Sequence, residues 1–260
     1  MRHLTTRLLG LLSIALIVPC APSLRAQTTA RPRTDILERM RRAYEGTWYS
    51  TLTFTQRTII ARTGGVTDTT IWYEALSGPA RLRIDFGPPA KGNGALFTAD
   101  STFLIRDGKL ARTTAVGNPF LPLIMGVYLQ PAAETLRQIA LFGFDATRSG
   151  TAHWEGRPVT IVGAATADDS TSAQFWIDDE RQILVRVRGA VRGTGGADIH
   201  VGGYQRIGEA WLATRVTIAS ATQTQVEEYT DWKAGVPLAE SLFDLAQWTT
   251  AAHWLTGRKP

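Results

Sequence analysis

Three histidines in the body of the sequence are the side chains most able to do acid, base or metal chemistry. They are His153, His200 and His253, which are far apart in the chain and lie beside apolar or strand-forming residues. A zinc site or a catalytic site needs such side chains at ligand spacing or next to a carboxylate, and no His-x-x-x-His pair occurs. The sequence therefore favours structural or surface roles for all three histidines.

Two acidic runs and one glycine-rich run could bind ions. The acidic runs, residues 168–169 and 178–180, could attract a cation, but solvated hairpins explain them better. The run 193–196 has no helix pattern after it, so it reads as a turn and not as a phosphate cradle. No nucleophile elbow, phosphate loop or dinucleotide fingerprint is present. We expect no enzyme and no metal or cofactor, and two histidines beside a carboxylate would revive the enzyme interpretation.

The other notable feature of the sequence is its supply of aromatic and aliphatic side chains on predicted strands. Six of the eight tryptophans fall on predicted strands. The simplest interpretation is a filled β core. A wide sheet, however, leaves interior space unless helices fill it, so a ligand cavity is a second possibility.

The stretch 48–60 is the first long strand pattern of the chain. Trp48, Leu52 and Phe54 share one parity, whereas threonines and Arg57 share the other. A period of two places these sets on opposite faces of a sheet. We predict a strand here with one apolar face.

The preceding residues 34–46 have apolar side chains at helical spacing, which predicts an amphipathic helix that covers a sheet. Strands follow at 67–75, 81–86, 95–99 and 101–106, with a tight Asp107-Gly108 hairpin. Alternation within 81–86 predicts that Arg81, Arg83 and Asp85 face outwards. The apolar, proline-containing run 118–125 is expected to be a core plug or a movable flap, and 131–142 a second helix.

Seven further strand patterns occupy the second half of the chain. Short alternating runs separated by turn residues extend from 151 to 232, and a short helix is expected at 249–255. About a dozen antiparallel strands at regular spacing indicate a barrel or a sandwich. We predict a mainly β (α+β) fold with one large domain, residues 34–260.

The N-terminal residues 1–26 have the order of a secretory signal peptide. A basic start precedes an apolar run of about 11 residues, too short to span a bilayer easily. We expect export, cleavage after Ala26 and a linker at 27–33. Retention as an interfacial anchor is an alternative. Cys20, the only cysteine, is in this segment and could carry a lipid, but the preceding Ile-Val-Pro matches a lipidation signal poorly.

The charge of the chain gives no support for nucleic-acid binding. Arg2, Arg7 and Arg25 supply three of the five net positive charges, so residues 27–260 carry +2. This charge is small and scattered, without a basic cluster interleaved with aromatic residues.

The order of these features resembles the LolA-like outer-membrane lipoprotein carriers and lipoprotein-sorting proteins. The features are the leader, the first helix, the Phe-Thr-Gln-Arg strand at 54–57, the Trp72-Tyr73 strand, the Gly-Pro turn into 81–86, the strand pair around 107–109, the Pro119-Phe120 stretch, the 175–178 strand and the late segment 237–243. The resemblance implies a half-open antiparallel barrel covered by helices, which holds acyl chains during transit through the periplasm.

The resemblance also implies the absence of a cofactor and of covalent catalysis. One position departs from it: the carriers have an Arg-Pro pair that helps to latch the lid, and here Gly78 precedes Pro79. The absence of the arginine puts in doubt whether this protein follows the shuttle cycle of the carriers. Arg81 or Arg83 could take the place of the latch arginine, but both are expected on the outward face of their strand. A relative that binds another lipid, or a sensor of the same fold, is the alternative.

We therefore expect a periplasmic, monomeric carrier of lipoprotein acyl chains or lipid, with inner- and outer-membrane transfer proteins as partners. A cell-envelope sensor or interaction domain that recognises a protein partner is the other hypothesis; a cavity too small for an acyl chain, with a large exposed apolar patch elsewhere, would favour it. The expected cavity lining is Trp48, Leu52, Phe54, Trp72, Leu82, Ile84, Phe86, Phe103, Ile105, Phe175 and Ile177.

Overall fold

The computed structural model describes residues 34–255, so the expected signal peptide and linker lie outside the described part of the chain. The first predicted helix is α1 (Thr34–Ala43), and the second is α3 (Ala132–Ala140). The apolar run before α3 forms the π-helix η2 (Pro122–Gly126) and the short α2 (Val127–Leu129). Three single turns of 3-10 helix complete the set: η1 (Pro89–Lys91), η3 (Glu240–Phe243) and η4 (Leu245–Gln247).

The strands confirm the mainly β prediction. Their bounds are β1 (Thr51–Arg62), β2 (Thr67–Ser77), β3 (Arg81–Phe86), β4 (Gly94–Phe97), β5 (Thr102–Arg106), β6 (Lys109–Thr114), β7 (Ser149–Trp154), β8 (Arg157–Val162), β9 (Gln174–Asp178), β10 (Ile183–Arg188), β11 (Asp198–Gly202), β12 (Gln205–Ile207), β13 (Ala210–Leu212), β14 (Arg215–Ala219) and β15 (Gln223–Ala234).

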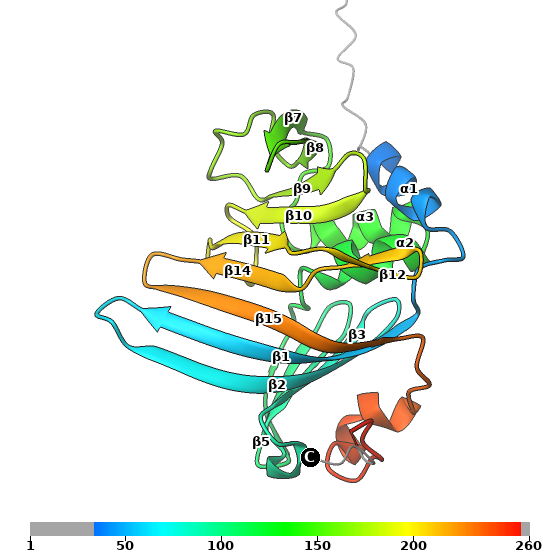
Figure 1. The fold of residues 1–260 in the computed structure, drawn as a ribbon, viewed down its shortest axis with the longest axis vertical. Helices are drawn as coiled ribbons and strands as arrows, with labels where there is room; N and C mark the ends of the chain where they lie inside the picture. The colour runs from blue at the N-terminus through cyan, green and yellow to red at the C-terminus, as the bar shows by residue number, and fades with distance from the viewer. Residues whose placement is uncertain (1–33, 256–260) are drawn as a thin grey trace, which may run out of the picture. The chain divides into compact units, whose positions relative to one another are not determined.

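Thirteen of these strands form one antiparallel sheet, in the order β6-β5-β4-β3-β2-β1-β15-β14-β11-β10-β9-β8-β7 (Figure 1). The first six strands form a meander, and the chain then crosses through η2, α2 and α3 to the opposite edge. From β7 the remaining strands return until β15 pairs with β1. Within the described residues β6 and β7 are the two edges of this sheet, which is therefore open.

Strand β1 is central because β2 and β15 pair with its two edges. Gln56 lies opposite Trp72 on one side and Tyr229 on the other, and Phe54 lies opposite Glu74. Residues directly opposite one another share a face of the sheet. This register gathers five side chains from three strands on the inner face.

The tight turn between β5 and β6 follows from its Asp-Gly sequence. Asp107 and Gly108 have φ angles of 47° and 73°. A two-residue hairpin of this kind needs positive φ at both central residues, which Asp and Gly tolerate better than most residues. The expected hairpin is confirmed here.

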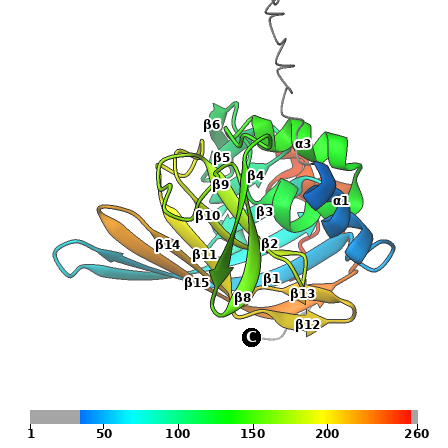
Figure 2. The same cartoon turned by 90° about the horizontal axis from the view of Figure 1, so that it is seen from above.

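Helices α1 and α3 lie together on one side of the curved sheet (Figure 2). The apolar side of α1 is buried, and Ile36, Leu37 and Met40 each expose 1% or less. Below the helix, the rings of Trp48 and Tyr128 stack at 3.7 Å between centroids. The amphipathic helix thus covers the sheet as its pattern predicts.

The C-terminal prediction is wrong in one respect, because residues 249–255 form turns and no helix. This segment packs against the outer face of β3 instead. The Arg83 guanidinium lies 3.8 Å from the centroid of the Trp248 ring, and His253 Nε2 lies 3.2 Å from an Asp85 oxygen. Individual side chains hold this segment against the sheet, whereas a helix would need an apolar face with a regular spacing of contacts.

Two residues that were predicted to face outwards to solvent are buried. Arg83 and Asp85 do lie on the outer face, but they expose only 2% and 0%. Arg83 donates two hydrogen bonds to the Asp85 carboxylate, at 2.9 and 3.0 Å, and others to the carbonyls of Leu242 and Trp248. The alternation of side chains along β3 predicted the correct face for Arg83 and Asp85. Both are buried because the C-terminal segment covers that face.

The pKa of Asp85 reflects this burial and its partners. Burial by itself would raise the pKa, but hydrogen bonds from His253 and Arg83 hold it below its ordinary value. The carboxylate therefore contributes stability above the pKa of an unfolded Asp, about 3.9, and loses this contribution as the pH falls through the folded pKa.

We predict that Arg83→Met lowers the free energy of unfolding by about 3–5 kcal/mol, because it leaves the Asp85 charge buried without its main partner. The matched control is Arg81→Met on the same strand, whose partner Glu240 is 80% exposed. Exposed pairs are worth under about 1 kcal/mol. Urea unfolding at pH 7 measures both variants, and equal losses would contradict the buried-pair interpretation.

Candidate functional site

A pocket lies between the inner face of the sheet and the segment that leads into α2. Strands β1, β2, β3, β10, β11, β13, β14 and β15 contribute to its wall. The centre of a water-sized sphere can occupy about 160 Å³ of it, and the whole hollow with its open mouth measures about 970 Å³. A volume of this kind suits a small ligand or part of a larger one.

Most of the wall is apolar. Leu52, Leu82 and Ile84 belong to one buried hydrophobic cluster on the inner faces of β1 and β3. The Phe54 ring lies 4.5 Å from that of Trp232 and 5.1 Å from that of Tyr229, measured between centroids. The side chains of neighbouring strands thus form a continuous oily surface.

The opposite wall comes from residues 118–129, which we call the cover segment. Its Leu121, Leu123 and Met125 are buried, whereas Phe120 and Ile124 face the pocket. The sequence allowed either a core plug or a movable flap for the run 118–125. In this structure the segment is packed into the core and also closes one side of the pocket.

Gly78 lies directly against the cover segment. A Cβ atom at this position would lie 2.3 Å from Leu129 Cδ1, closer than any real contact. A larger residue at position 78 would therefore require the Leu129 side chain to move. In this structure Gly78 and the cover segment meet in an apolar contact.

Six of the eleven expected lining residues line the pocket, and five lie elsewhere. The six are Trp48, Leu52, Phe54, Trp72, Leu82 and Ile84. Of the others, Phe86 packs against Trp72 with the two rings tilted at 50°, Phe103 and Ile105 pack with Trp248, and Phe175 and Ile177 are fully buried beneath the helices. Trp72 faces inwards, and its neighbour Ile71 is 40% exposed.

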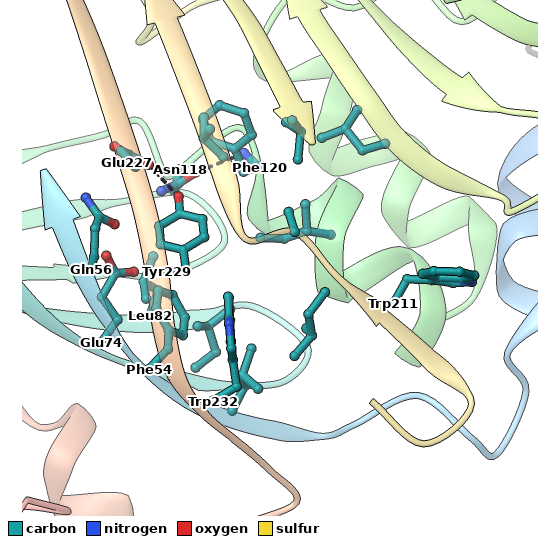
Figure 3. A pocket seen from close by; sticks show the side chains of 18 of the residues that line it. Phe54, Gln56, Glu74, Leu82, Asn118, Phe120, Trp211, Glu227, Tyr229 and Trp232 are labelled. Carbon is teal, nitrogen blue, oxygen red and sulfur yellow. Dashed lines mark hydrogen bonds between the residues drawn. The ribbon is translucent and has the colours of Figure 1, made fainter. Parts of the chain in front are cut away.

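The sequence analysis missed a polar cluster at one end of the pocket. Gln56, Glu74, Glu227 and Tyr229 lie together there, and Trp211 lies at the other end (Figure 3). Gln225 Nε2 donates to one oxygen of Glu227 at 2.6 Å, and the Tyr229 hydroxyl donates to the other. Parity could have revealed them, because Gln56 shares the face of Leu52 and Phe54.

Burial controls the protonation of this cluster. Desolvation raises the pKa of Glu74 well above its ordinary value, and the nearby charge of Glu227 raises it further. Desolvation also raises the pKa of Glu227, although hydrogen bonds from Tyr229 and Gln225 oppose the change. The phenol of Tyr229 has a raised pKa for the same reason and stays protonated.

The histidines do not gather around a shared carboxylate. His200 Nε2 lies 3.4 Å from Asp198 on β11, and its ring packs on Trp154. His253 instead contacts Asp85 on β3. Among residues 34–255, no group of three or more His, Cys, Asp or Glu side chains could hold a metal ion.

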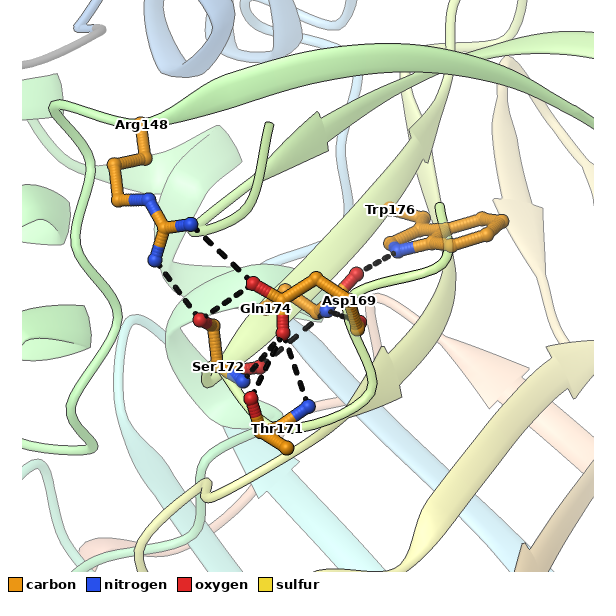
Figure 4. Close-up of polar contacts among 6 residues, drawn as sticks. All are labelled: Arg148, Asp169, Thr171, Ser172, Gln174 and Trp176. Carbon is orange, nitrogen blue, oxygen red and sulfur yellow. Dashed lines mark hydrogen bonds and ion pairs between the residues drawn. The ribbon is translucent and has the colours of Figure 1, made fainter. Parts of the chain in front are cut away.

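The acidic run 168–169 organises a loop. One Asp169 oxygen accepts from the backbone N–H groups of Thr171 and Ser172 at 3.0 and 2.9 Å, and the other lies 3.3 Å from Arg148 (Figure 4). Hydrogen bonds from Ser172 and Thr171 lower the pKa of Asp169. Asp169 therefore holds its loop beside β9. In β9 itself, Trp176 Nε1 donates a hydrogen bond to Gln174 at 2.7 Å.

Solved structures share this architecture at low sequence identity. A "putative outer membrane lipoprotein-sorting protein domain" from Vibrio parahaemolyticus matches with a TM-score of 0.57 and 12% identity, over 83% of this chain and 97% of that one. A LolA superfamily protein from Nitrosomonas europaea matches with a TM-score of 0.51 and 10% identity, over 83% and 98%. The chain has the LolA-like fold. The predicted fold class, an open antiparallel barrel with covering helices, is confirmed.

Two sequence comparisons find nothing, since no family model and no curated protein matches the chain. Among residues 34–255, none of the helices has the length and apolar content needed to cross a membrane.

We predict that Glu74→Gln stabilises the protein at pH 8 by more than about 1 kcal/mol. A raised pKa means that folding takes up a proton, so the unfolding free energy falls as the pH rises from about 4.3 through the folded pKa. Glutamine keeps the shape without this titration, and each tenfold change in a protonation equilibrium is worth about 1.4 kcal/mol. Urea unfolding at pH 4, 6 and 8 measures the effect.

The control for this prediction is Glu228→Gln, next to Glu227 on the other face of β15. The Glu228 carboxylate pairs with Arg57 and Arg215, and hydrogen bonding to Arg57 lowers its pKa. This variant should gain no stability at pH 8. A loss of stability in Glu74→Gln at pH 8 would show that the buried carboxyl is satisfied when it is charged.

Proposed function

We propose that this protein is a non-catalytic carrier of the cell envelope that binds acyl chains of lipoproteins or lipids in its pocket. It would be exported to the periplasm, need no cofactor and pass its cargo towards the outer membrane through transfer proteins. The observation that carries the proposal is the apolar pocket between an open antiparallel sheet and an apolar cover segment. The LolA-like fold supports it.

The hydrophobic effect supplies the affinity in this proposal. Each methylene removed from water contributes about 0.8 kcal/mol, so even part of an acyl chain yields several kcal/mol. The side chains of Leu52, Phe54 and Ile84 offer the matching surface. The carrier needs no directional bonds to hold the chain.

The size of the pocket sets a condition on this function. About 160 Å³ is close to the volume of an engineered cavity that holds a benzene ring. A long acyl chain must therefore lie partly in the open mouth or displace the cover segment. The contacts of Ile124 and Leu129 with the sheet are apolar, and such contacts can re-form in a new position without leaving unpaired polar groups.

The same small volume favours a second function, that of an envelope sensor or interaction domain. In that case the pocket would be a partly filled core, and the partner would be a protein. The exposed apolar residues Val66 and Ile71 on the β1–β2 hairpin are surfaces for such a partner. Co-purified lipid distinguishes the two functions.

The primary test is to express the full chain in a Gram-negative host, purify it from the periplasm without detergent and analyse bound molecules by mass spectrometry. The carrier proposal expects an acylated species at close to one per protein. A stable protein without any acylated ligand, which also fails to bind added fatty acid or lipopeptide, would favour the interaction domain.

We predict that Ile84→Trp reduces acyl-chain binding at least tenfold, because the larger side chain fills the pocket from β3. Ile71→Trp is the matched control, since Ile71 is exposed on the neighbouring strand. Displacement of a fluorescent fatty acid measures affinity, and thermal unfolding verifies that both variants fold. Equal binding by both variants would place the acyl site elsewhere.

A further inference from the structure

The charged groups at the polar end of the pocket are all acidic, and an acyl chain makes no use of them. Glu74 and Glu227 contribute carboxyl groups, and the described residues that line the pocket include no Lys, Arg or His. A phosphate or carboxylate head group would therefore meet negative or neutral groups without a compensating positive charge. Burial makes such a mismatch costly.

Glu74 is the group in this cluster that lacks a partner. Its side chain exposes 4%, and its buried Oε1 atom has no hydrogen-bond partner. Buried polar atoms are nearly always paired, so an unpaired carboxyl oxygen at the wall of a pocket points to a donor supplied by a ligand. The two oxygens of Glu227, by contrast, already accept hydrogen bonds from Gln225 and Tyr229.

Aromatic rings surround this oxygen-rich end. Trp72 and Tyr229 flank Gln56 on the two neighbouring strands, and Phe54 and Trp232 pack together beside them. The faces of such rings attract cations, most strongly when water is excluded. Carboxyl oxygens and ring faces together form a site for a positive group. The indole N–H groups of Trp48 and Trp232, which have no hydrogen-bond partner, could donate to an anion, but no positive side chain in the lining would balance its charge.

We infer that the pocket takes an amphiphile whose polar end is an ammonium group, with Glu74 as its direct partner and Glu227 as a second negative charge nearby. This inference rests on the proposed function, because it names the class of apolar ligand that the carrier binds. The alkyl part lies along Leu52, Leu82 and Ile84. The N–H groups of the ammonium supply the donor that Glu74 Oε1 lacks.

Binding of the ammonium group is coupled to the release of a proton. In the empty pocket the raised pKa of Glu74 favours the neutral acid. The incoming cation ionises Glu74, and the proton passes to water. The other titratable groups that line the pocket are Glu227 and the phenols of Tyr49, Tyr128, Tyr204 and Tyr229, and the phenols stay neutral because burial raises their pKa. Affinity for the cation therefore rises between pH 5 and pH 8.

The test uses three probes with the same twelve-carbon chain: dodecylamine, dodecan-1-ol and dodecanoic acid, each below its micelle concentration. Isothermal titration calorimetry with the purified full-length mature chain measures their affinity at pH 5 and pH 8. A primary amine stays charged across this range, since its pKa is near that of Lys, about 10.4. We expect dodecylamine to bind at least tenfold more tightly than either other probe at pH 8, with a smaller difference at pH 5.

Two variants and a control locate the effect. Glu74→Gln should remove most of the preference for the amine over dodecan-1-ol, and Glu227→Gln should reduce that preference in part. Glu228→Gln carries the same change on the opposite face of β15, where the carboxylate is paired with Arg57 and Arg215. This control should behave as the unmodified protein, which excludes a general effect of net charge.

Proton release gives a readout that does not depend on affinity. Titrations with dodecylamine at pH 6.5 in two buffers of different ionisation enthalpy should show a net release of protons, which Glu74→Gln abolishes. If the acid or the alcohol binds as tightly as the amine, the carrier function stands and the ammonium inference fails. If none of the three probes binds, the carrier function fails as well.

Discussion

The structure depends on the two-residue alternation of β1, the strand that joins the two halves of the sheet. β2 and β15 pair with its two edges, so inward side chains of β1 such as Leu52 and Gln56 have a neighbour on both sides. Leu52 and Phe54 thereby become the floor of an apolar hollow, and Gln56 and Thr58 continue it as a polar strip. A shift of one residue in register would exchange this face for the threonines and Arg57 of the other.

An open sheet with a hydrophobic inner face needs a cover, and the segment between β6 and β7 provides it. This crossover is the point at which the chain leaves one edge of the sheet and rejoins it at the other. It carries η2, α2 and α3 across the concave side, and α1 packs beside them. Gly78 allows Leu129 to approach β2 and β3 closely, so the cover is held by packing and not by an ion pair.

The two faces of β3 show how one strand serves two functions. Its inward Leu82 and Ile84 line the pocket, whereas its outward Arg83 and Asp85 form a buried ion pair beneath the C-terminal segment. The pair costs desolvation and fixes the position of that segment through the carbonyls of Leu242 and Trp248. The C-terminal residues thus pack against the outer face of the strand, while its inner face lines the pocket.

Local pattern in the sequence was enough to predict most of the strands, the two main helices, the Asp-Gly hairpin and the faces of β1 and β3. It did not separate β11 from β12 or β13 from β14, because the breaks lie between residues with strand-forming patterns on both sides. These features follow from side-chain periodicity and turn chemistry, which act over a few residues. The C-terminal helix was predicted wrongly because contacts with a strand about 160 residues away decide that segment.

The sequence by itself determined which side chains share a face, because alternation along a strand is a local property. Only the tertiary structure decided which faces are covered and which enclose a pocket. Phe175 and Ile177 have the same pattern as Leu82 and Ile84, yet they lie under the helices because β9 is opposite the crossover and β3 is beside the hollow. In the same way, Glu74 and Glu227 lie about 150 positions apart, and only the pairing of β2 and β15 with β1 brings them to one end of the pocket.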